Sequence, residues 1–86
     1  MKLLFCKKCG DLFNLRLTER VCSCGRTKGQ YITETQAVYE GEHAVPLGIL
    51  NDSFAIARRN QPISGNGRRF TAFVIPKECE TFIKKE

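Results

Sequence analysis

The sequence lacks a long run of apolar residues. Only three apolar side chains, at positions 3–5, separate Lys2 from Cys6, and two lysines follow at once. A secretory signal needs an apolar stretch of about 7–15 residues, and a membrane-spanning helix needs roughly 18. We therefore expect neither, and the simplest location is a cytoplasmic, reducing one without a membrane partner.

Histidine is also scarce, with His43 the only one. Neither His43 nor Cys79, the fifth cysteine, has a neighbouring group that would make it a general base or a nucleophile. No paired carboxylates suited to acid–base chemistry stand out. We expect a protein that is not an enzyme, in which His43 lies in a loop and Cys79 is a partly buried thiol.

Length limits the hydrophobic core. A chain of 86 residues forms one domain and buries only about 60–65% of its unfolded surface. Small domains of this kind usually need an additional staple, such as a metal ion or disulfides. The cysteines are the obvious source of one.

Four of the five cysteines form two tight pairs, twelve residues apart: Cys6 and Cys9, then Cys22 and Cys24. Each pair is followed by a glycine, which accepts the positive φ that such a turn often needs. Four thiolates suit a tetrahedral zinc ion, and a closed set of four leaves no position for water, so the site is predicted to be structural. Two alternatives remain open. Iron also accepts four sulfur ligands, and two disulfides would form in an oxidising compartment.

The motifs Cys6-x-x-Cys9-Gly10 and Cys22-x-Cys24-Gly25 resemble the two knuckles of a zinc ribbon, within the wider rubredoxin-like group. The resemblance covers roughly residues 1–35. It implies a small antiparallel sheet capped by one structural zinc ion. The second knuckle is one residue shorter than the paired C-x-x-C of rubredoxin, which favours zinc over iron.

The remaining pattern is that of an α+β protein. Apolar residues at 13, 15 and 17 alternate with polar ones at 14 and 16, which predicts a strand over 12–17. Further short strands are predicted over 2–5, 30–33, 37–39 and 81–83. Residues 70–75 are apolar on both faces apart from one threonine, which is typical of a central strand.

One helix is predicted over 49–60. Leu50, Phe54 and Ala57 recur with the spacing of a buried helical face. Asn51 or Ser53 is expected to cap its start. Before it, Pro46 and Gly48 predict a loop.

We therefore expect a small antiparallel sheet that carries the zinc ribbon, with the helix packed on the sheet. Residues 1–35 would form the ribbon and residues 36–86 a helix-plus-strand extension, folded together as one domain. The expected core residues are Phe13, Leu15, Leu50, Phe54, Phe73 and Val74.

Charge is unevenly distributed along the chain, which carries a net +5. Residues 1–30 contain seven basic and two acidic residues, and residues 58–86 contain seven basic and three acidic ones. The middle segment, residues 31–57, has four acidic residues and no lysine or arginine. Basic ends flanking an acidic middle would form a basic face if the two ends meet in the fold.

A surface for anions is predicted from the basic residues, chiefly the two arginine pairs at either end of residues 60–67. The candidates are Arg58, Arg59, Arg68, Arg69, Arg26 and Lys28. Arginine forks around phosphate, and glycines at 65 and 67 allow close backbone approach. The alternative is that these side chains are solvated and bind no partner, since arginines at a helix C-terminus complement the helix dipole on their own.

The function expected from these features is a binding module for nucleic acid or an acidic protein. The alternative is a protein–protein adaptor, or an accessory or phage-type regulator, without nucleic-acid binding.

Overall fold

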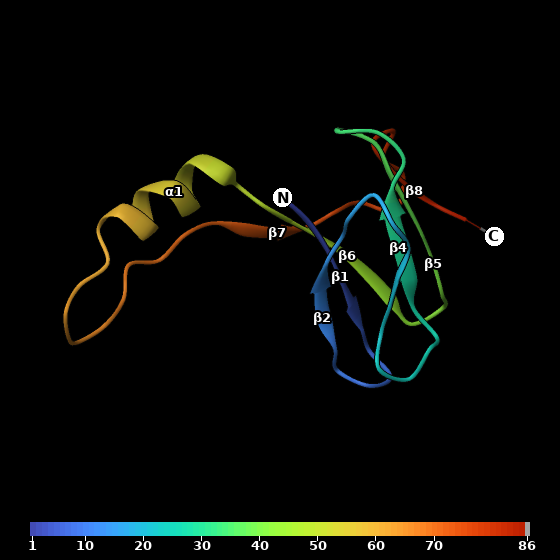
Figure 1. Ribbon diagram of the computed structural model, residues 1–86, viewed down its shortest axis with the longest axis horizontal. Helices are drawn as coiled ribbons and strands as arrows, with labels where there is room; N and C mark the ends of the chain where they lie inside the picture. Colours follow the sequence, from blue (N-terminus) through green and yellow to red (C-terminus); the bar gives the residue numbers. More distant parts are fainter. Residues whose placement is uncertain (86) are drawn as a thin grey trace.

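The computed structural model describes residues 1–85, which form two four-stranded β-sheets and one helix (Figure 1). The elements are β1 (Lys2–Cys6), β2 (Leu12–Asn14), β3 (Arg20–Val21), β4 (Lys28–Tyr31), β5 (Ala37–Glu40), β6 (Ala44–Ile49), α1 (Asn51–Arg59), β7 (Ala72–Val74) and β8 (Phe82–Lys84). The first sheet has the order β2-β1-β6-β7 and the second β3-β4-β5-β8. All pairs are antiparallel except β5 with β8, which is parallel. The chain is thus α+β and mainly sheet.

Both sheets combine strands from distant parts of the chain. In the first sheet β1 pairs with β6 as well as with β2. In the second, β5 pairs with both β4 and β8. The predicted strand over 12–17 ends early, at Asn14. The structure therefore contains two sheets where the sequence predicted one.

The longest strand, β6, was missed because Pro46 and Gly48 indicated a loop. Leu4 of β1 stands opposite Pro46 in the register of the sheet. The carbonyl of Pro46 accepts a hydrogen bond of 2.9 Å from the amide of Ile75, so its polar groups face the β7 side. Pairing with β7 ends one residue away, at Leu47. The missing proline N–H would point to this same side, at the end of the pairing with β7, so the proline removes no bond between β6 and β1.

Gly48 is needed in β6 because an aromatic ring covers it. A Cβ atom built there would lie 2.7 Å from Cζ of Phe73, closer than real contacts allow. Gly48 and Phe73 are cross-strand partners of β6 and β7. The glycine thus makes room for the ring to lie across the strand, which explains why a residue typical of turns lies within a sheet.

The core lies among the strands of the two sheets. Its most buried members are Leu4, Cys6, Ala37, Tyr39 and Phe82. The rings of Tyr39 and Phe82 meet edge to face, with centroids 5.1 Å apart. The predicted burial of Phe13 and Leu15 is confirmed.

The other four expected core residues are not buried. Leu50, Phe73 and Val74 are 51%, 47% and 64% exposed, and Phe54 is half-buried. For Phe73 and Val74 the reason is that the strand predicted to be central forms β7, at the edge of its sheet. For Leu50 and Phe54 it is the position of the helix.

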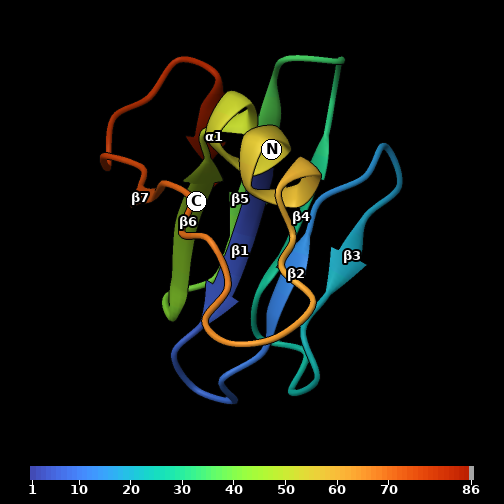
Figure 2. The same ribbon diagram turned by 90° about the vertical axis from the view of Figure 1, so that its left-hand side faces the viewer.

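The helix does not pack on either sheet, contrary to the prediction. Together with the segment that returns from it, it projects from the sheets as an arm, residues 50–71 (Figure 1), and Figure 2 looks along this arm toward the sheets. The radius of gyration, 14.1 Å, exceeds the roughly 12 Å expected of a globular chain of this length. The remaining residues, 1–49 and 72–85, are called the sheet body below.

Contacts within the arm are local. Phe54 of the helix meets Phe70 of the return segment edge to face, with centroids 4.9 Å apart. At the base, the amide of Leu50 donates to the carbonyl of Thr71 at 2.9 Å. No helix in the described part of the chain is long and apolar enough to cross a membrane.

The predicted helix caps are wrong, although the helix itself is confirmed. Leu50 occupies the cap position and makes no side-chain capping bond. Asn51 instead accepts a hydrogen bond from the N-terminal ammonium group at 2.8 Å. Ser53 donates to the carbonyl of Leu50 and accepts from the amide of Thr71. Asn51 thus attaches the arm to the N-terminus, and Ser53 ties the start of the helix to the returning segment.

Candidate metal centre

The four cysteine sulfurs predicted to bind metal lie together. One Sγ atom from each of Cys6, Cys9, Cys22 and Cys24 lies within 4.8 Å of the other three. The Sγ of Cys24 is 3.7 Å from that of Cys6 and 3.5 Å from that of Cys22. Four sulfurs around a tetrahedral zinc ion, with Zn–S bonds of about 2.3 Å, lie about 3.8 Å apart. The cluster therefore has the dimensions of a four-coordinate metal site.

Each cysteine pair lies on a tight turn, as the spacing predicted. The amide of Gly10 donates to the carbonyl of Cys6 at 2.8 Å, and that of Gly25 to Cys22 at 3.0 Å. Gly10 and Gly25 have φ values of 77° and 79°, in the left-handed region that glycine adopts readily. The two turns present their sulfurs to one point from opposite sheets.

Two residues that the sequence did not single out support these turns. The carboxylate of Asp11 accepts hydrogen bonds from the amide and the hydroxyl of Ser23, at 3.0 and 3.1 Å. This links the segment after the first turn to the second turn. The amide of Thr27 donates to the Sγ of Cys22 at 3.3 Å. No spacing rule identifies these residues, because their roles depend on how the two turns meet.

The pKa shifts within the cysteine cluster differ in direction. For Cys22, burial is the largest influence and raises the pKa, but the Thr27 amide and the adjacent thiols outweigh it and bring the pKa to about 6. The pKa of Cys6 is also lowered, chiefly by the side chain of Thr27. The hydroxyl of Thr27 is buried beside the sulfur of Cys6 and has no hydrogen-bond partner within residues 1–85.

Cys24 shows the opposite shift. The backbone at Arg26 lowers its pKa, but burial and the neighbouring thiols Cys22, Cys6 and Cys9 raise it to about 11. The raised pKa means that Cys24 keeps its proton near neutral pH. A bound dication would stabilise all four thiolates and release protons as it binds.

The donor set therefore fits a metal ion, and Cys6, Cys9, Cys22 and Cys24 would hold it. All five cysteines are free thiols in the structure. Cys6 and Cys22 are buried, whereas Cys9 and Cys24 are exposed. The site would thus lie at the surface, with Cys6 and Cys22 on its buried side and Cys9 and Cys24 on its exposed side.

The predicted anion-binding residues separate into two groups. Arg58, Arg59, Arg68 and Arg69 are all exposed and all lie on the arm. Arg58 and Arg68 line the same small groove, of about 270 Å³, beside Phe54 and Phe70. The fold thus brings the helix end and the return segment together at these two arginines.

Arg26 and Lys28 lie elsewhere. Both belong to the sheet body, at the second cysteine turn and in β4, on the side away from the arm (Figure 1). The ammonium of Lys28 is 3.3 Å from the carboxylate of Glu40, its cross-strand partner. These two residues do not join the arginines of the arm in one patch.

His43 and Cys79 also have defined places. His43 lies in the turn before β6, with Nε2 3.5 Å from a carboxylate oxygen of Glu42. Cys79 is half-buried, as expected, and its Sγ lies 3.5 Å from the hydroxyl of Thr81. Neither contributes to the four-sulfur cluster.

Comparison with protein-family models, curated proteins and solved structures gives no match to this chain.

Proposed function

We propose that the protein is a binding module stabilised by a structural zinc ion, which is bound by Cys6, Cys9, Cys22 and Cys24. Four thiolates close the coordination shell and leave no open position for a substrate or a water. The ion holds the two sheets together at one edge and does no chemistry, and the protein is not an enzyme. Iron is the alternative metal, since it accepts the same ligands.

The proposed partner is a nucleic acid, contacted by the arm. One observation carries this proposal: four exposed arginines project from the sheet body on one small element. Asp52 is the only acidic residue among residues 50–71. Within residues 1–85, none of the four arginines forms an ion pair with a carboxylate. Unpaired guanidinium groups of this kind suit phosphate oxygens.

The resemblance to zinc ribbons supports this proposal for residues 1–35, because such ribbons often serve in binding modules. The reducing location follows from the same site, since free thiolates persist in the cytoplasm. We propose that residues 1–35 and 36–86 fold as one domain, supported by sheets that contain strands of both.

Fluorescence anisotropy with a labelled DNA duplex and a labelled single-stranded RNA tests the proposal. Changing Arg58, Arg59, Arg68 and Arg69 to alanine should weaken binding at least about tenfold and flatten its dependence on salt. The charge-matched comparison sets the arm variant Arg68→Ala, Arg69→Ala against Arg16→Ala, Lys85→Ala, which removes two exposed cations from the sheet body. Equal losses in both variants, or binding that is insensitive to salt, would refute a specific role for the arm.

A second function is favoured by the apolar residues of the arm. Ile63 is fully exposed, and Leu50 and Ile56 are 51% and 43% exposed. Such side chains next to arginines suit an acidic protein partner, which is the adaptor or accessory-regulator alternative. Pull-down with and without nuclease separates the two functions. A protein that stays bound after nuclease treatment, and is lost on changing Leu50 and Ile63 to serine, would favour the adaptor.

A further inference from the structure

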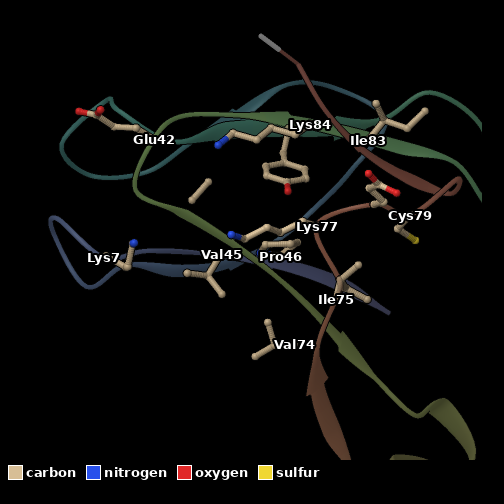
Figure 3. Close-up of a pocket in the computed structure, with 13 residues that line it drawn as sticks. Lys7, Glu42, Val45, Pro46, Val74, Ile75, Lys77, Cys79, Ile83 and Lys84 are labelled. Carbon is tan, nitrogen blue, oxygen red and sulfur yellow. The ribbon is translucent and has the colours of Figure 1, made fainter.

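The sheet body contains a cavity of about 730 Å³ (Figure 3). It lies among β6, β8, the segment after β7 and the first cysteine turn, whereas the arginines belong to the arm. Its size falls within the roughly 300–1,000 Å³ of typical small-molecule sites. The proposed nucleic-acid contact does not use it.

Apolar side chains form much of its wall. Val45 and Pro46 come from β6, Ile75 follows β7, and Ile83 comes from β8. These residues come from three separate segments and line one hollow. They would accept the apolar body of a ligand but give it no orientation.

Three lysines supply positive charge to the same cavity. Lys7 comes from the first cysteine turn, Lys77 from the segment after β7, and Lys84 from β8. In Figure 3 their amino groups lie toward one end of the cavity, and Cys79 lies toward the other. Glu42 and Glu78 also line it. Among residues 1–85, however, neither carboxylate is within ion-pair distance of any of these lysines.

A buried phenol adds a second, independent feature. Tyr39 is only 3% exposed, yet it lines the cavity. Its ring is fixed by the edge-to-face contact with Phe82. No other described residue forms a hydrogen bond with its hydroxyl group. Burial raises the pKa of Tyr39, so the hydroxyl keeps its proton and remains a donor. The hydroxyl is not one of the fully buried polar atoms, so it is open to the cavity and can donate to a ligand there.

We propose that this cavity binds a small organic anion with an apolar body, such as an aromatic carboxylate. The negative group lies among Lys77, Lys84 and the Tyr39 hydroxyl, and the apolar body lies on Val45 and Ile75. The inference is independent of the nucleic-acid proposal, because the two surfaces share no residue.

An NMR titration of the metal-loaded, ¹⁵N-labelled full chain tests it, with 2-naphthoate as the probe and neutral 2-naphthamide as its matched control. Naphthoate should shift the amides of β6, residues 75–79 and β8 in a saturable way. Naphthamide should bind about tenfold more weakly, since it lacks the charge that strengthens hydrogen bonds to the lysines. Equal affinity for the two probes, or no saturable shift up to about 5 mM, would overturn the proposal.

Variants locate the anion within the cavity. The double change Lys77→Met, Lys84→Met and the single change Tyr39→Phe should each weaken naphthoate binding about tenfold and weaken naphthamide binding less, because a neutral carbonyl gains less from these donors than a carboxylate does. The control Arg68→Met, Arg69→Met removes the same charge from the arm and should leave naphthoate binding intact. If the arm variant loses naphthoate and the cavity variants keep it, the probe binds the arm and the inference fails. Well-dispersed spectra for each variant confirm that it has folded.

Discussion

In the sheet body, side chains from opposite ends of the chain pack on one another, whereas in the arm the packing contacts are made within a stretch of 22 residues. Leu4 and Phe82 share one core, and the cysteine turns join the two sheets at their edge. The arm has only one aromatic pair, Phe54 with Phe70, and one buried residue, Ala57. Half-exposed local contacts stabilise little, so the arm depends on its attachment to the body. The comparison indicates that the body determines stability and the arm is free to serve as a contact surface.

The largest expected effect comes from removing the metal. Structural zinc contributes apparent binding free energies of about 10–16 kcal/mol in small domains, more than such a domain's whole stability. A chelator under reducing conditions should therefore abolish the dispersed NMR spectrum of the sheet body. Cys22→Ser should do the same, while Cys79→Ser, outside the cluster, should leave metal content and spectrum unchanged. A chelated protein with an unchanged spectrum would show that the core alone holds the body together.

The next test compares an aromatic residue of each region. Phe82→Ala removes a fully buried ring and should lower the free energy of unfolding by about 3–5 kcal/mol. Phe54→Ala removes a half-buried ring whose aromatic partner is Phe70, and should cost only about 1 kcal/mol. Urea unfolding of the metal-loaded proteins measures both values. Similar losses would mean that the arm belongs to the same cooperative core, contrary to the comparison drawn above.

Two glycines with positive φ give a finer comparison. Gly41, in the body, has φ 125°, and a Cβ there would collide with the carbonyl oxygen of Arg26. Gly65, in the arm, has φ 84° with open space around it. Gly41→Ala should therefore destabilise by about 2–4 kcal/mol, and Gly65→Ala by only about 1 kcal/mol. Thermal unfolding monitored by circular dichroism compares the loss of stability in the two variants. The reverse order would contradict the packing described at the second cysteine turn.

The smallest expected effect on stability is that of the arm's charges. Changing all four arginines to alanine should alter the free energy of unfolding by no more than about 0.5 kcal/mol, because exposed side chains without partners contribute little. The same variant should show the weakened nucleic-acid binding described above. A large loss of stability would show instead that the arginines are structural.

How far the sequence could predict this structure depends on how local each feature is. The cysteine cluster was predictable because tight spacing and a following glycine largely determine each turn, and Gly10 and Gly25 have the expected φ values. The helix was predictable because the spacing of its apolar residues is also a local feature of the sequence. Its position was not, because nothing in the spacing of Leu50, Phe54 and Ala57 says whether a sheet or a returning segment covers that face.

Features that depend on distant residues were missed. Pro46 and Gly48 are typical of loops in sequence. Their place in a strand is explained only by distant residues, namely the end of β7 beside Pro46 and the ring of Phe73 over Gly48. The cavity could not be predicted for a similar reason, since Lys7 is far in sequence from Lys77 and Lys84. Of the predicted anion surface, Arg58 and Arg68 share a groove, whereas Arg26 and Lys28 belong to another part of the fold.

Native mass spectrometry of the freshly purified, reduced chain tests the central claim most directly, that a metal ion on four thiolates holds the sheet body together. The expected result is a folded charge-state distribution carrying one zinc ion per chain, lost on changing Cys22 to serine. Iron in place of zinc would change the metal but keep the site. A folded, metal-free chain, or one whose mass is lowered by the hydrogens lost to disulfides, would contradict the claim.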